Sequence, residues 1–322
     1  MAALVKSSLL ALAVLPLVGQ TLNSPLTTLV FHAASRSLRP IVGMPGSSYL
    51  GPSVYPDLDF GSVSPDQKTA IIETAGRVTF IRSMQNQETA DVETAITAID
   101  LILWSDDSST AILFSAANRQ IQWITNGKAG SATDLPIGTR LLAAQCDAQG
   151  AIAASDGRVY RITPDTAPVQ IATFGDPTAA ATDATGNTIY IADAATQQIL
   201  VLSNNGGGYN QRPFLAATEE IPDRAALLLS ADGATLYVAM KSARTLSAYR
   251  TADKTLTTRL ALDWVPSSFE RLSKETYLLN PGARVGEPFS VLSTRNGLAA
   301  VSYTHLRAHE TKANLVCRLL LE

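Results

Sequence analysis

Three residues near the end of the chain carry side chains that could do chemistry. His305 and His309 are four residues apart, a spacing that would place two imidazoles on one face of a helix, where they could bind a metal ion. Cys317 adds a thiol, which as a thiolate is both a nucleophile and a metal ligand. Together they are two of the three histidines and one of the two cysteines in the 322-residue chain. The end of the chain is therefore the first candidate for a metal centre or a nucleophilic site.

The same segment has a second explanation. VSYTHLRAHET and NLVCRLLLE resemble the translation of an adapter used in sequencing libraries, with Lys312 and Ala313 between them. This resemblance implies that residues 301–322 are not native sequence, and that the native protein continues beyond residue 300. Such a tail is left out of fold reasoning, as tags and fusion scars are. The metal site suggested by His305 and His309 is then not expected.

Outside the tail only one histidine and one cysteine remain. His32 alone cannot supply the three or four ligands that a zinc site needs, and it is interpreted as a surface or hairpin residue. Cys146 lies in an apolar run that ends in a turn, which favours a small buried side chain over a nucleophile. The sequence therefore predicts no catalytic residue, no metal and no cofactor.

Polar residues do recur at one position, directly after a strand that is repeated six times. Loops on a rigid scaffold often carry function, so we predict that these residues form a rim that binds a protein, a peptide or a small ligand. The alternative is that they only solvate turns. The candidates are Glu73, Ser115, Ser155, Asp193, Lys241 and Asn280.

The elements that position these residues are short strands in a unit that repeats roughly every 40 residues. Each unit has a turn rich in Asp, Ser or Gly and then an apolar strand, as in DSSTAILF from Asp107 and SADGATLYVA from Ser230. A second strand with alternating apolar residues follows. Its central apolar residues are Val78, Ile121, Val159, Ile199, Leu246 and Phe289.

Alternation gives each strand two faces, so one unit cannot bury its apolar surface alone. We predict an all-β fold, a β-propeller with six visible blades of about 40 residues. Two stacked β-sandwiches are the alternative, but they do not require even spacing. The segment 28–43 reads as a further hairpin and predicts a seventh blade, which strands from both chain ends would share.

Two stretches carry a family resemblance. IYIADAATQQILVL (189–202) resembles the NHL repeat, and LYVAMKSARTLSAYRTADKTLTTRL (236–260) resembles the YVTN-type repeat of exported propeller proteins. The likeness covers roughly residues 57–300. It implies a propeller fold, and the families it points to include binding scaffolds and a few enzymes.

Propeller enzymes usually act at the central channel, so the channel-facing residues matter. These should lie three or four positions before each repeated turn, and a hard cation there would need carboxylate ligands. None of the predicted positions is ionisable, which disfavours metal catalysis; Asp100 and Glu270, near these strands, are interpreted as turn or rim residues. The predicted positions are Ser62/Val63, Leu103/Trp104, Ala143/Ala144, Ala179/Ala180, Ala226/Leu227 and Ser267/Ser268.

The net charge and the N-terminal residues indicate which partners and which cellular compartment to expect. A formal net charge of −3 predicts no attraction to nucleic acid or anionic lipid. Residues 1–20 combine an early lysine, Lys6, with an apolar run that is too short to span a bilayer, which predicts a signal peptide and a secreted or periplasmic protein. An N-terminal buried helix is the alternative.

The predicted organisation is a signal peptide (1–20), a closing-blade hairpin with a loop (21–56), the propeller repeats (57–300) and a foreign tail (301–322). The preferred function is a non-catalytic binding scaffold that uses its rim loops. A lactonase-like hydrolase or lyase, with a central metal site partly supplied by a missing C-terminus, is the alternative. A purely structural envelope module is the third possibility.

Overall fold

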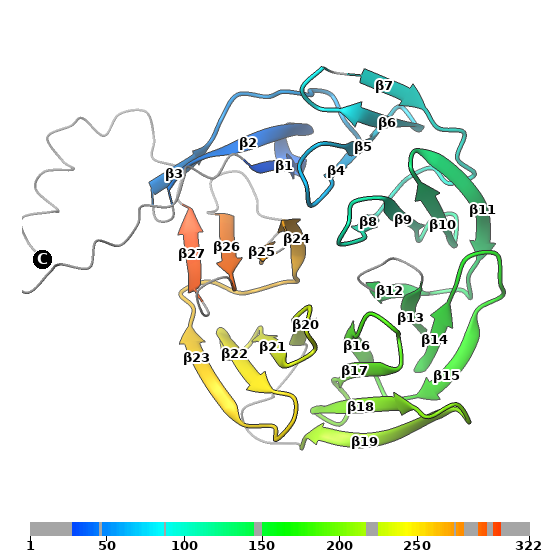
Figure 1. Ribbon diagram of the computed structural model, residues 1–322, viewed down its shortest axis with the longest axis vertical. Helices are drawn as coiled ribbons and strands as arrows, with labels where there is room; N and C mark the ends of the chain where they lie inside the picture. Colours follow the sequence, from blue (N-terminus) through cyan, green and yellow to red (C-terminus); the bar gives the residue numbers. More distant parts are fainter. Residues whose placement is uncertain are drawn as a thin grey trace, which may run out of the picture.

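A computed structural model describes residues 28–303, apart from 45–46, 87, 145–149, 217–224, 274, 280–288 and 295–298. Within these residues the chain forms six four-stranded antiparallel sheets, arranged as blades around a central axis (Figure 1). The single helical segment described is a 3-10 turn, η1 (Ala33–Ser35). The structure thus confirms the all-β propeller and its six blades.

Each blade uses four consecutive strands, ordered from the axis outward. The innermost strands are β4 (Phe60–Val63), β8 (Leu101–Trp104), β12 (Arg140–Ala144), β16 (Pro177–Thr182), β20 (Ala225–Leu229) and β24 (Glu270–Ser273). The second strands are β5 (Ala70–Thr74), β9 (Thr110–Ser115), β13 (Ala151–Ser155), β17 (Thr188–Asp193), β21 (Thr235–Met240) and β25 (Thr276–Leu278). The third strands are β6 (Arg77–Ser83), β10 (Gln120–Thr125), β14 (Arg158–Ile162), β18 (Gln198–Asn204), β22 (Thr245–Arg250) and β26 (Phe289–Ser293). The outermost strands are β7 (Glu88–Asp91), β11 (Lys128–Asp134), β15 (Val169–Thr173), β19 (Tyr209–Leu215), β23 (Leu256–Ala261) and β27 (Ala299–Tyr303).

Turn chemistry fixes several of the hairpins. Asn126–Gly127 joins β10 to β11 and Asp156–Gly157 joins β13 to β14, and in both turns both residues have positive φ. Two consecutive left-handed residues make the tight turn whose twist matches antiparallel strands, and Asn-Gly and Asp-Gly are the sequences that tolerate it best. These dipeptides therefore set the register of the strands that they connect.

Apolar side chains are buried between neighbouring blades. Between the second and third blades, Ile112 and Trp123 pack with Ala151 and Ile162 in one cluster. Similar clusters fill the other spaces between blades. Because each blade lends one face to each neighbour, the blades are stable only as a ring.

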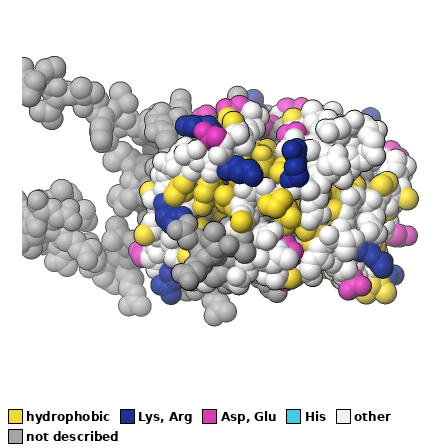
Figure 2. Space-filling model, turned by 90° about the horizontal axis from the view of Figure 1, so that it is seen from below, with side chains coloured by type: hydrophobic (Ala, Val, Ile, Leu, Met, Phe, Trp, Pro, Cys, Tyr) yellow, Lys and Arg dark blue, Asp and Glu magenta, His cyan; other side chains and the backbone are white. Residues whose placement is uncertain are grey.

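The outer side of the ring carries both hydrophobic and charged side chains. On the face seen in Figure 2, hydrophobic side chains gather towards the middle, and Lys, Arg, Asp and Glu lie around them. The outer strands alternate exposed and half-buried residues, as in β23, which accounts for this mixture.

A three-stranded sheet lies between the sixth blade and the first (Figure 1). It consists of β1 (Thr28–His32), β2 (Ser37–Met44) and β3 (Ser47–Leu50). One face packs on the first blade, with Leu38 against Val63 and Ile81. The other packs on the sixth blade, with Val30 against Leu272. This closing sheet therefore completes the ring.

The direction of β1 identifies its place in the sheet. Its first residues lie near the turn that follows β4, since the backbone N–H of Leu29 donates to Gln67 Oε1 at 2.8 Å. Beyond its other end, Arg36 Nε donates to the carbonyl of Leu58, just before β4 begins. Thus β1 runs opposite to β4, as a second strand does. The closing sheet supplies second, third and outer strands, and no strand of the described residues pairs with the inner edge of β1.

Segment 28–43 was predicted to form a hairpin of a further blade. The hairpin is present as β1 and β2, and β3 extends it. At the other end, β27 pairs with β26 through Tyr303, so the first three residues of the expected foreign tail lie in the sixth blade. Residues 304–322 and the expected signal peptide lie outside the described residues, and their origin stays a prediction.

Candidate functional site

The innermost strands enclose a cavity of about 650 Å³ on the axis of the ring. Each of the six blades contributes residues to its wall, and Phe31 and Ala33 of the closing sheet complete the lining. The volume lies within the range of sites that bind small molecules. The central channel is therefore the candidate site.

The residues predicted to face the channel largely do so. Of the twelve positions, all line the cavity except Val63, and Ala144, whose side chain lies outside the described residues. Five of the six inner strands were thus placed correctly from the spacing of the repeated turn.

The sixth inner strand was misplaced, and the error hid the main ionisable residue of the channel. Its predicted positions, Ser267 and Ser268, lie before the strand, which is Glu270–Ser273. The pair Ser273–Thr276 shows that the turn to β25 follows Ser273. The turn in this blade begins later than the sequence pattern suggested, so counting back from it ended too early. The interpretation of Glu270 as a turn or rim residue was therefore wrong, since it belongs to β24 and lines the cavity. Asp100 also lies in the lining, but it is exposed just before β8 and accepts from the N–H of Ala116 in a turn at 2.7 Å, as a turn residue does.

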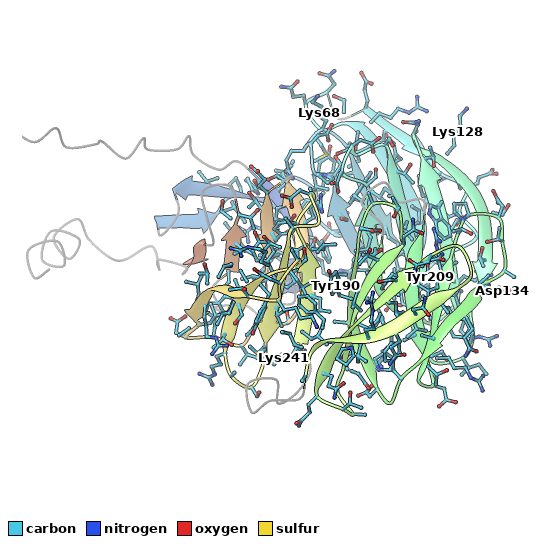
Figure 3. All side chains as sticks on the ribbon, turned by 60° about the horizontal axis from the view of Figure 1, so that its bottom comes forward. Lys68, Lys128, Asp134, Tyr190, Tyr209 and Lys241 are labelled. Atoms are coloured by element: carbon cyan, nitrogen blue, oxygen red, sulfur yellow. The ribbon has the colours of Figure 1, made fainter. Side chains whose placement is uncertain are left out.

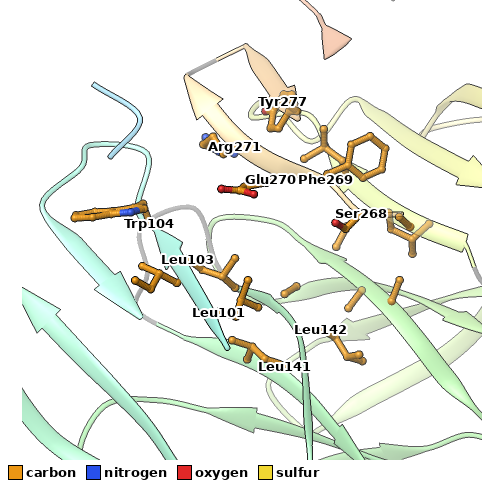
Figure 4. Close-up of a pocket in the computed structure, with 18 of the residues that line it drawn as sticks. Leu101, Leu103, Trp104, Leu141, Leu142, Ser268, Phe269, Glu270, Arg271 and Tyr277 are labelled. Atoms are coloured by element: carbon orange, nitrogen blue, oxygen red, sulfur yellow. The ribbon is translucent and has the colours of Figure 1, made fainter. Parts of the chain in front are cut away.

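Glu270 projects its carboxyl group into the cavity (Figure 4). Burial raises its pKa from 4.5 to about 7, because desolvation penalises the charged form. Among the described residues, no side chain or backbone group makes a hydrogen bond or an ion pair with this carboxyl group. A carboxyl group with a pKa near neutrality can accept and return a proton at neutral pH.

Arg271, the next residue of β24, lies beside Glu270 (Figure 4) but its charge is already matched. Its guanidinium forms an ion pair with Asp106, which follows β8 in the second blade. The guanidinium carbon also lies 5.4 Å from the ring centroid of Tyr277, a cation–π geometry. Because Asp106 neutralises Arg271, the arginine does not offset the burial of Glu270.

Leucine side chains line the channel below Glu270 in the view of Figure 4. Leu101 and Leu103 come from β8, and Leu141 and Leu142 from β12. All four are half-buried, so part of each side chain is open to the cavity. These four residues are called the leucine wall below. Next to it, the indole N–H of Trp104 donates to Ser62 Oγ at 3.0 Å, which fixes the ring against the first blade.

Two of the predicted rim residues hold connecting loops instead of facing solvent. Glu73, at the end of β5, accepts hydrogen bonds from the backbone N–H groups of Ala98 (2.7 Å) and Ile99 (2.9 Å) in the next connecting loop. Asp193, at the end of β17, accepts from the N–H of Asp176 at 2.6 Å. Both side chains are buried. In this arrangement they organise the loops that enter the inner strands.

The other four predicted rim residues have different surroundings. Ser115 is buried and bonded to Asn118, and Ser155 donates to the carbonyl of Ile137 at 2.7 Å. Lys241 follows β21 and lines the cavity, whereas Lys68 and Lys128 are exposed (Figure 3). Asn280 lies outside the described residues. Lys241 is therefore the described rim candidate that also belongs to the cavity.

The histidines and cysteines singled out from the sequence add nothing to this site. His305, His309, Cys317 and Cys146 lie outside the described residues. His32 is buried at the end of β1, with Nδ1 at 2.7 Å from Ser35 Oγ. No group of three or more His, Cys, Asp or Glu in the described part of the chain could hold a metal ion. The acids of the cavity therefore do not fit a metal centre.

Comparison with known proteins gives the fold. The sequence matches no family model and no curated protein. Among solved structures, it is similar to the periplasmic gluconolactonase of Pseudomonas aeruginosa, with a TM-score of 0.57, 15% identity and coverage of 87% of this chain and 96% of that one.

Two further structures are similar to it. For a candidate 6-phosphogluconolactonase of Bacteroides fragilis the TM-score is 0.59 with 13% identity, covering 88% of this chain and 97% of that one. For virginiamycin B lyase of Staphylococcus aureus the TM-score is 0.54 with 13% identity, covering 77% and 84%. These likenesses confirm the propeller fold and agree with the NHL/YVTN-type resemblance.

The comparisons also correct the preferred function. The sequence favoured a non-catalytic scaffold, but these three neighbours are named as lactonases or as a lyase. The scaffold prediction depended on a channel without ionisable residues, and Glu270 removes that premise. The hydrolase or lyase alternative agrees better with both findings.

Proposed function

We propose that this protein is a propeller hydrolase that opens a lactone ring in the central cavity, with the carboxyl group of Glu270 as the proton acceptor. The observation that carries the proposal is the placement of this carboxyl group: it projects into an enclosed cavity and has no partner among the described residues. The names of the neighbouring structures support the choice of a lactone. The predicted export of the chain and the periplasmic neighbour support a site of action outside the cytoplasm.

The chemistry follows from the properties of a partly desolvated carboxylate. Glu270 takes a proton from a water molecule, and the resulting hydroxide adds to the carbonyl carbon of the lactone. The tetrahedral intermediate collapses by breaking the ring C–O bond. Glu270 then returns the proton to the leaving alkoxide, and the product is an open-chain hydroxy acid.

The neighbouring groups suit this step. Arg271 supplies N–H donors near the reacting carbonyl while Asp106 keeps the pair neutral, so Glu270 retains its basicity. Ser268, which also lines the cavity, offers a hydroxyl donor for the developing oxyanion. Because the described acids do not fit a metal centre, these side chains carry the proposed reaction.

The first prediction tests Glu270 directly. Replacing it (Glu270→Gln) removes the base but keeps the shape, so we expect lactone hydrolysis to fall at least about 100-fold. A panel of γ- and δ-lactones, including glucono-δ-lactone, would be followed by acid release. Stability at pH 8 should not fall, since the neutral amide avoids burying a charge.

The matched control is Glu275→Gln, the same substitution at an exposed position of the same blade. It should leave the rate unchanged. Reaction in ¹⁸O-labelled water separates the two activities of the alternative, because hydrolysis incorporates the label into the product carboxylate and an elimination does not. An unlabelled product, or full activity in Glu270→Gln, would rule out the proposal.

A further inference from the structure

The leucine wall lies across the channel from the reactive carboxyl group. In Figure 4, Leu101, Leu103, Leu141 and Leu142 line the cavity below Glu270, and Phe269 lies beside Glu270. Leu101, Leu103 and Leu141 also pack against the core between the second and third blades. Their positions are therefore fixed by the fold, and their remaining surface forms a rigid apolar face of the cavity.

Small side chains line the part of the cavity beside this wall. Ala143, Ala179 and Ala226 line the cavity with methyl groups only. These small side chains leave room for a molecule between Glu270 and the leucine wall. Leu227, Leu228 and Leu229 of β20 also line the cavity and add to its apolar surface. The long polar side chains in this part of the lining belong to Arg140, the first residue of β12, and Lys241, which follows β21.

This division of the cavity favours one class of ligand. A polyhydroxylated ring would place hydroxyl groups against leucine side chains that cannot form hydrogen bonds, and each unpaired hydroxyl would weaken binding. An alkyl or aryl substituent would instead replace water at the leucine wall, which is favourable. The reacting ester group would still face the carboxyl group and Arg271.

We infer that the substrate is an apolar lactone, a cyclic ester with an alkyl or aryl substituent that packs on the leucine wall while its carbonyl group faces Glu270. This inference rests on the proposed lactone hydrolysis and specifies its substrate class. It also separates this protein from neighbours that are named for gluconolactone substrates.

The test uses two matched series of ligands. The first is γ-lactones with unbranched side chains of increasing length, assayed for kcat/KM. The second is the corresponding γ-lactams, which resist hydrolysis and whose affinity is measured by calorimetry. Each methylene that packs on the wall should raise kcat/KM and lactam affinity about fourfold until the wall is covered. Glucono-δ-lactone should be a poor substrate.

Two variants test whether the dependence on chain length comes from the leucine wall. Leu103→Asn and Leu141→Asn should each flatten the dependence on chain length, whereas Leu141→Met should preserve it because its volume and polarity are close to those of leucine. Leu256→Asn, at an exposed position of β23, is the control and should change nothing. Thermal unfolding identifies any variant that fails to fold, in which case the unmodified protein and Leu141→Met still decide the question.

The outcomes separate this inference from the function on which it rests. Lactam affinity that rises with chain length, without hydrolysis of any lactone, supports the apolar site and removes the proposed activity. Efficient hydrolysis of glucono-δ-lactone with no gain from alkyl chains keeps the lactonase and overturns the apolar substrate. Both series rising together supports both.

Discussion

At the scale of single residues, the decisive feature is a carboxyl group kept away from compensating charge. The pKa of Glu270 is raised to about 7, so the folded protein binds a proton there more tightly than the unfolded chain does. Stability therefore falls as the pH rises from about 4.5 to about 7 and is constant above that range, by up to roughly 3 kcal/mol. In the proposed hydrolysis this carboxyl group is the proton acceptor, a role that its raised pKa suits.

The ion pair beside Glu270 gives a prediction for pH dependence. Because the base must be deprotonated, the rate should rise with pH around a midpoint near 7. Asp106→Asn frees the positive charge of Arg271, which stabilises the carboxylate and should lower that midpoint by about one pH unit. The pH profile of kcat/KM on one lactone measures the shift.

Asp91→Asn is the control for this experiment. It removes an exposed ion pair with Arg77 on the outer edge of the first blade, at 3.2 Å. The midpoint should not move in that variant. A profile that is identical in Asp106→Asn and the parent protein would show that Arg271 does not act on Glu270.

At the scale of elements, buried acids at the ends of second strands position the inner strands. Glu73 holds the loop that precedes β8 through two backbone N–H groups, and Asp193 holds the loop that precedes β16. Glu73 belongs to the first blade and holds the loop before the inner strand of the second blade. Asp193 holds the loop before the inner strand of its own blade, the fourth. Glu73 and Asp193, called tethers below, therefore act, in the described structure, on loop geometry.

Replacing one tether should destabilise the fold measurably. Glu73→Ala leaves the buried N–H of Ile99 and the neighbouring N–H of Ala98 without their acceptor, which should cost about 3 kcal/mol of unfolding free energy. Chemical denaturation measures this loss. Glu88→Ala, at an exposed position of β7, is the matched control and should change stability by less than about 0.5 kcal/mol.

Sequence and structure agree where the repeat is regular. Val78, Ile121, Val159 and Leu246 were predicted to centre buried strands, and all are at most 2% exposed. The sixth blade is irregular, so its inner strand was placed at Ser267 and Ser268, and Glu270 was interpreted as a turn or rim residue. Aligning Tyr277 and Leu278 with the second strands of the other blades would have moved the inner strand to Glu270.

The role of Glu73 could not be predicted in the same way. Its partners, Ala98 and Ile99, lie in a connecting loop whose sequence shows no repeat, and only the folded arrangement brings them together. The place of β1 was equally hidden, because a second strand and a third strand carry the same alternation of apolar residues. Direction, which the sequence pattern does not contain, distinguishes them.

At the scale of the whole molecule, non-covalent contacts close the ring. The closing sheet packs on the sixth blade and on the first blade. These two contacts together are called the seam of the ring, and Gln67 lies across it. Its side chain accepts from the N–H of Leu29 at 2.8 Å and donates to the carbonyl of Leu272 at 2.9 Å. One residue of the first blade thus connects the closing sheet to the sixth blade.

Shortening that side chain should loosen the seam selectively. Gln67→Asn keeps a residue that tolerates the positive φ of 61° at this position but cannot reach both partners. We expect a loss of about 2 kcal/mol and faster hydrogen exchange in β1 and β24. Gln211→Asn, on the exposed strand β19, is the control. Uniformly faster exchange around the ring would contradict a local seam.

The pairing of Arg271 with Asp106 has a further consequence. These residues belong to the sixth and second blades, which are separated around the ring by the closing sheet and the first blade. Both line the cavity, so their contact joins two blades that are not neighbours in the ring. Movement of either blade towards or away from the channel would therefore strain this ion pair, so the pair links the positions of β24 and the residues after β8.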